Sequence, residues 1–132
     1  MPYVVIVTVV ALMQFLMIGF QVGRARTKYG VHAPAMSGHP AFDRIFRVQM
    51  NTLEQLVMFL PVMWIFARFI SPLWAAAFGV VFIIGRMIYA ITYVREPKSR
   101  ALGFALTAIP TLIMMVWLLV WAVQALASGA WR

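Results

Sequence analysis

Residues 4–23 read VVIVTVVALMQFLMIGFQVG, and this uncharged stretch decides the fold class of the chain. It matches the ~20 consecutive apolar residues with which an α-helix crosses a bilayer core. It lacks the basic leading segment and the small-residue cleavage pattern of a secretory signal peptide. We therefore interpret it as a retained transmembrane helix at residues 3–24.

The composition places the whole chain in the membrane class. Of its 132 residues, 64% are hydrophobic and 11% are charged, and none is cysteine, whereas soluble domains carry about 25% charged residues. Three more apolar stretches predict helices at residues 42–70, 72–95 and 98–128. The sequence thus predicts an all-α fold, an integral membrane four-helix bundle that forms a single domain over residues 1–132.

Basic residues dominate the charge of the chain, which is formally +8, with eleven Lys and Arg residues against three acidic ones. Most of the basic residues fall around the first and third connections, at Arg24, Arg26, Lys28, Arg44, Arg47, Arg95, Lys98 and Arg100. Under the positive-inside rule, these connections face the cytoplasm and both termini lie on the other side. There Arg132 adds a single charge and Trp131 is expected to be an interfacial anchor. Because the basic residues form no aromatic-studded groove, we predict no nucleic acid partner.

The second helix begins with a polar face in the segment RVQMNTLEQ, residues 47–55. At about 100° per residue, Arg47, Asn51 and Glu54 share one side of a helix, while Gln49 points nearly the opposite way. Ionised groups cost about 2.5–3.5 kcal/mol near the centre of a membrane helix, so these residues need partners. Two interpretations stay open: an Arg47–Glu54 pair bridged by Asn51 that only supports packing, or a ligand site.

A second polar stripe is predicted on the third helix at the same end of the bundle. Arg86, Tyr89 and Tyr93 stand at i, i+3 and i+7, and Arg100 follows seven residues later near the start of the last helix. Taken alone, the tyrosines are typical of an aromatic belt, and both arginines are typical of contacts with lipid head groups. If the stripes converge, they form a cationic pocket in which Glu54 is the only carboxylate.

The charges of this pocket indicate the kind of ligand. Its arginines, Arg26, Arg47, Arg86 and Arg100, outnumber Glu54 and favour a molecule with several carboxylates, which guanidinium groups grip in pairs of hydrogen bonds. Glu54 could pair with an ammonium group of the same molecule, so a zwitterionic peptide fits. His32 and His39 lack acidic or cysteine companions, and we predict no metal site.

Three stretches resemble the MAPEG family, the membrane-associated proteins of eicosanoid and glutathione metabolism. They are RARTKYG (24–30), FDRIFRVQMNTLEQ (42–55) and RMIYAITYVREPKSR (86–100), and the resemblance covers essentially the whole chain. Its most specific parts are the spacing of Arg47, Gln49, Asn51 and Glu54 and the spacing of Tyr89, Tyr93 and Arg100.

The resemblance implies a homotrimer that binds glutathione, as co-substrate, between neighbouring subunits at the cytoplasmic side. Arg100 is then the catalytic residue that holds the glutathione sulfur as thiolate, while Gln49 and Arg26 serve the site next door. Together with the pocket, it gives these glutathione contacts: Arg26, Arg47, Gln49, Asn51, Glu54, Arg86, Tyr89 and Tyr93. The implied enzyme is a glutathione transferase for lipophilic electrophiles, with peroxidase activity towards lipid hydroperoxides as a further expectation.

Two rival functions remain. One is a non-enzymatic lipid-binding or scaffold protein of the same fold, which Arg100 disfavours. The other is a small four-helix cation exporter, which would need the Glu54 carboxylate free of the nearby arginines. The compact chain, without a targeting or retention signal, favours a bacterial inner membrane.

Overall fold

The computed structural model describes residues 1–129, and within that range the chain is helical with no strand. The elements are α1 (Pro2–Tyr29), α2 (Pro40–Phe69), α3 (Pro72–Arg95), the short 3-10 helix η1 (Pro97–Ser99) and α4 (Ala101–Ser128). The predicted all-α fold is confirmed. Trp131 and Arg132, for which an interfacial anchor and a lone C-terminal charge were expected, lie outside the described residues.

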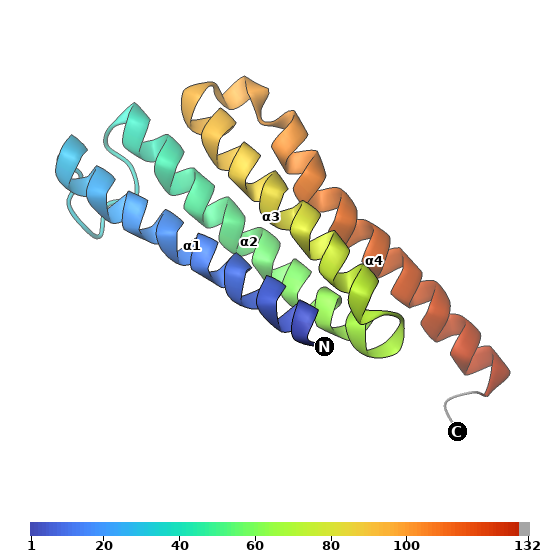
Figure 1. Cartoon of the computed structure of the whole chain (residues 1–132). Coiled ribbons are helices and arrows are strands. Elements are labelled where there is room, and N and C mark those ends of the chain that lie inside the picture. Colours follow the sequence, from blue (N-terminus) through green and yellow to red (C-terminus); the bar gives the residue numbers. More distant parts are fainter. Residues whose placement is uncertain (130–132) are drawn as a thin grey trace.

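The four long helices run side by side as an up-and-down bundle (Figure 1). α2 and α3 pack on each other, α1 packs against both of them, and α4 packs mainly on α3. The α1–α2 connection and η1 lie at one end, and the start of α1 and the end of α4 lie at the other (Figure 1). We call the first of these the basic end, because it holds the cluster of basic residues from Arg24 to Lys28 and from Arg95 to Arg100.

Each long helix is long and apolar enough to cross a membrane. Large apolar side chains cover the outside of the bundle: Phe20 is 63% exposed, Leu119 66% and Leu126 67%. A soluble protein rarely exposes so much apolar surface. In a bilayer these side chains contact lipid instead of water, so their exposure carries no free-energy cost of hydrating apolar surface.

The structure corrects three of the predicted helix boundaries. α1 runs to Tyr29 rather than to residue 24, because no helix breaker intervenes before Gly30, whose left-handed conformation (φ 68°) ends the helix. α2 starts at Pro40, two residues early, where His39 Nδ1 accepts the Ala41 N–H at 3.1 Å. The predicted helix 98–128 divides into η1 and α4, with Arg100 between them.

α3 and α4 approach each other closely at glycine residues. A Cβ atom on Gly103 of α4 would collide with the backbone and side chain of Tyr89 on α3, and one on Gly85 would meet Leu106 and Thr107. Small residues of this kind let membrane helices approach closely. The Gly103 contact therefore brings the beginning of α4 against the end of α3.

Candidate functional site

A cavity of about 790 Å³ opens at the basic end between α2, α3, η1 and the start of α4. It is lined by Arg47, Asn51, Tyr89, Tyr93, Lys98, Arg100, Ala101 and Phe104. Members of both predicted polar stripes therefore meet at this cavity, whereas Glu54 and Arg86 do not line it. Within residues 1–129 no acidic residue lines the cavity, so this part of its wall is cationic.

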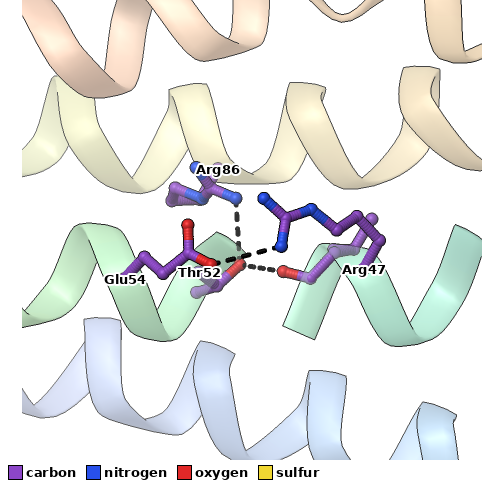
Figure 2. A network of polar contacts seen from close by, with 5 residues as sticks. Arg47, Thr52, Glu54 and Arg86 are labelled. Carbon is purple, nitrogen blue, oxygen red and sulfur yellow. Dashed lines mark hydrogen bonds and ion pairs between the residues drawn. The ribbon is translucent and has the colours of Figure 1, made fainter. Parts of the chain in front are cut away.

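Arg47 and Glu54 are joined directly across two turns of α2. Arg47 Nη1 lies 3.2 Å from Glu54 Oε1 (Figure 2). Both side chains are about half exposed, at 51% and 52%. Asn51 does not bridge them, because its Oδ1 atom is buried and accepts no hydrogen bond. Glu54 does not line the cavity but contacts Arg47, which does, and Asn51 is a lining residue whose amide oxygen is buried without a hydrogen-bond partner.

Arg86 lies behind the cavity rather than in its wall. Its side chain is fully buried. The Arg86 Nη2 atom donates a hydrogen bond to Thr52 Oγ1 at 3.0 Å (Figure 2). The Thr52 hydroxyl in turn donates to the Val48 carbonyl at 2.7 Å. The Arg86 guanidinium carbon is 4.3 Å from the centre of the Tyr89 ring. Arg86 stands three residues before Tyr89, about one helical turn away on α3, and packs against the Tyr89 ring instead of lining the cavity. Its contact with the ligand stays a prediction.

Two stacked tyrosines form the α3 side of the cavity. The rings of Tyr89 and Tyr93 are 5.4 Å apart with an interplanar angle of 14°. Tyr89 is 3% exposed, packed with Ile18 and Val48. A ring so enclosed has little freedom to rotate, so its hydroxyl position is set by the fold.

The backbone on both sides of η1 fixes the position of Arg100. Glu96 is extended, as the residue before a proline tends to be, and this ends α3. Ser99 Oγ donates to the Glu96 carbonyl at 2.7 Å, and Glu96 Oε1 accepts the Lys98 N–H at 3.4 Å. Arg100 follows as the N-cap residue of α4, and its exposed side chain lines the cavity. Across residues 1–129 the one ion pair is Arg47–Glu54, so Arg100 and Lys98 have no acidic partner there.

Arg26 and Gln49 lie outside this cavity. Arg26 Nη1 donates to the Ala35 carbonyl at 2.6 Å in the α1–α2 connection, and its guanidinium covers the Phe42 ring at 5.0 Å. Gln49 is on the other flank of α2, where its amide nitrogen faces Gly19 of α1. The structure therefore separates these two residues from the rest of the predicted set.

Sequence reasoning missed three of the lining residues. By sequence alone, Lys98 is only one of the basic residues that set the orientation, and Ala101 and Phe104 belong to an apolar helix. A signal was available for Phe104, because it lies one helical turn after Arg100 and must share its side of α4. Among the described residues no three His, Cys, Asp or Glu side chains come close enough to hold a metal ion.

The helices and the cavity define an integral membrane protein, a four-helix bundle with a cationic site at one end. The sequence model of the MAPEG family matches residues 4–120. The chain therefore belongs to the MAPEG family.

Relatives agree with this assignment. An uncharacterized protein of Synechocystis sp. is 45% identical over 111 residues, which cover 84% of this chain and 81% of that protein. Human microsomal glutathione S-transferase 2 is 39% identical over 87 residues, 66% of this chain and 59% of its own length. Mouse leukotriene C4 synthase is 32% identical over 114 residues, 86% of this chain and 73% of its own. The match thus spans about three fifths of the human transferase.

Proposed function

We propose that this protein is a membrane-bound glutathione transferase. The observation that carries the proposal is the meeting of Arg47, Asn51, Tyr89, Tyr93 and Arg100 around one cavity whose wall holds no acid. Glutathione has two carboxylates, one ammonium group and one thiol, and such a cavity suits its net negative charge. The names of the relatives, a glutathione transferase and a leukotriene synthase, support the same chemistry.

In this proposal, some residues bind the charged groups of glutathione and another residue activates its sulfur. Arg47 and Lys98 supply cations for the carboxylates, and Glu54, beside Arg47, accepts the ammonium group. Arg100 stabilises the sulfur as thiolate, which a free thiol with a pKa near 8.5 forms only in part at neutral pH. The thiol proton leaves to solvent, and the thiolate attacks an electrophilic carbon of the second substrate. A carbon–sulfur bond forms while the bond from that carbon to its leaving group breaks, and the leaving group, a halide ion in the case of an aryl halide, departs with the electron pair.

The site is completed by a neighbouring subunit in this proposal. Arg26 and Gln49 belong to the predicted glutathione contacts but lie outside the cavity of their own chain. A homotrimer would let them serve the adjacent site, as the family resemblance implies. Their separation from the other contacts supports this arrangement.

The proposed setting is a bacterial inner membrane with the basic end in the cytoplasm. The Synechocystis relative and the crowding of basic residues at one end support it. The second substrate is a lipophilic electrophile that reaches the site from the bilayer. Reduction of lipid hydroperoxides by the same thiolate is a further proposed activity.

A conjugation assay tests the function. Purified protein, supplied with glutathione and an aryl halide, should form the conjugate, and it should form none with S-methylglutathione, whose sulfur is blocked. A scaffold protein or a cation exporter would show no turnover in either reaction. A lipid hydroperoxide in place of the aryl halide tests the peroxidase activity separately.

A further inference from the structure

A second cavity, of about 560 Å³, lies on the other flank of α3, between α3 and α1. The two cavities use different sides of the same helix. Tyr89 and Tyr93 face the first cavity, whereas Ala90 and Val94, one residue further on, line the second. A step of about 100° per residue accounts for this division. The second cavity contains none of the predicted glutathione contacts.

The walls of the second cavity are of two kinds. Gln21, Arg24 and Lys28 stand at i, i+3 and i+7 along α1, and Arg95 faces them from the end of α3. The remaining wall is largely apolar and is contributed by all three neighbouring helices, including Ile45 of α2 and Ile91 of α3. An occupant that matches both kinds of wall needs an anionic group and an apolar part.

The cations of this cavity are available to a ligand. The only ion pair within residues 1–129 joins Arg47 to Glu54, so Arg24, Lys28 and Arg95 have no acidic partner in that part of the chain. The ends of α1 and α3 place partial negative charge nearby. Arg44 offsets some of it by donating to the Val94 and Arg95 carbonyls, each at 3.4 Å.

We propose that this second cavity binds an anionic phospholipid. Its phosphate contacts Arg24, Lys28 and Arg95, and the beginning of an acyl chain lies against the apolar wall between α1 and α3. Basic pockets between membrane helices are suited to anionic head groups. A zwitterionic lipid would bring its own cation towards the same three cations, and a small soluble anion would leave the apolar wall uncovered.

Native mass spectrometry of the whole protein in neutral detergent tests the proposal. Phosphatidylglycerol and phosphatidylcholine with identical acyl chains are the two probes, and retained lipid per chain is the readout. Phosphatidylglycerol should be retained in preference. Arg24→Gln, Lys28→Gln and Arg95→Gln should each weaken its retention about fivefold, as expected for one basic residue at a membrane surface. Arg68→Gln, which removes a charge at the end of α2 far from the basic end, is the matched control and should leave retention unchanged.

Four results would overturn the proposal. Equal retention of the two lipids by the unaltered protein would show no anion preference, and unchanged retention in all three variants would place the lipid elsewhere. Glycerophosphate carries the phosphate without acyl chains. If glycerophosphate displaced the bound lipid at the same concentration as added phosphatidylglycerol does, the cavity would be a site for soluble anions. Loss of the lipid on adding glutathione would assign the cavity to glutathione instead. The comparison of the two lipids uses only the unaltered protein, so it tests the preference for an anionic lipid even if a variant fails to fold.

Discussion

At the residue scale, the ion pair of Arg47 and Glu54 is weak enough for each side chain to change its ionic partner. Both side chains are about half exposed, and an exposed ion pair of this kind contributes only about 0.2–1 kcal/mol. A carboxylate of the ligand can therefore take the place of Glu54 beside Arg47 at little cost. In the proposed binding mode Glu54 is then free to accept the ammonium group, and until the ligand arrives Arg47 and Glu54 neutralise each other.

Glu54→Gln should weaken glutathione binding about 10- to 100-fold, the usual range for a lost hydrogen bond to a charged group. Calorimetric titration measures the affinity. Glu96→Gln is the matched control, because Glu96 is another carboxylate at the basic end and accepts only the Lys98 N–H. Equal affinity in the Glu54 variant and the unaltered protein would contradict its role in the site.

The sequence predicted which residues share a helical face but not how deep each one lies. Arg47, Asn51, Tyr89, Tyr93 and Arg100 do line one cavity, because helical spacing alone decides the face. The depth depends on the partner helix. The spacing places Arg86 in the pocket, yet its side chain is fully buried, bonded to Thr52 and packed against the Tyr89 ring. No spacing rule along α3 could have shown that contact.

At the element scale, the crossing of α3 and α4 holds the two halves of the cavity together. Tyr89 and Tyr93 come from α3, and Phe104 comes from α4, so the cavity depends on the distance between these helices. Gly103 sets that distance, since its missing side chain leaves room for the Tyr89 backbone. Sequence patterns gave the four helices and the end of α3 correctly. They missed η1, because it depends on hydrogen bonds of Glu96 and Ser99 rather than on apolar periodicity.

Gly103→Ala should therefore destabilise the bundle by about 1–3 kcal/mol, the usual cost of overpacking, and should lower conjugation activity. The extra methyl group pushes α4 away from Tyr89. Gly23→Ala is the control, because a Cβ atom there meets nothing within 4 Å. Thermal unfolding in detergent, with the conjugation rate, measures both effects. If the two variants behaved alike, the α3–α4 distance would not limit the site.

At the scale of the whole molecule, orientation in the membrane decides from which side the proposed substrate, glutathione, would enter. The chain has no cysteine, so single cysteines can report topology without interference. Ser37→Cys lies in the α1–α2 connection at the basic end, and Ser128→Cys lies at the end of α4. An impermeant thiol reagent should label Ser128→Cys in intact cells and Ser37→Cys only after the membrane is opened. The reverse pattern would contradict the proposed orientation.

The proposed trimer makes a prediction about mixtures of inactive subunits. Arg26→Ala removes the contribution to the neighbouring site, and Arg47→Ala removes the contribution to the chain's own site. Subunits of the two kinds, co-expressed with different affinity tags and purified through both, should regain some activity, because certain interfaces then combine two intact halves. Each variant mixed with itself is the control. If the doubly purified protein were no more active than these controls, each site would belong to one chain.

An ultraviolet pH titration of the glutathione complex tests the claim that Arg100 holds the glutathione sulfur as thiolate. The unaltered protein should show thiolate absorbance at neutral pH. Arg100→Ala should raise the apparent pKa of the bound thiol towards about 8.5, at about 1.4 kcal/mol per unit, and should lower turnover more than affinity. Arg100→Lys should recover part of both effects, because it keeps the charge without the planar fork. Arg24→Ala, which removes a positive charge elsewhere at the basic end, should leave the pKa unchanged. Equal thiol pKa values and equal turnover in the unaltered protein and Arg100→Ala would contradict the claim.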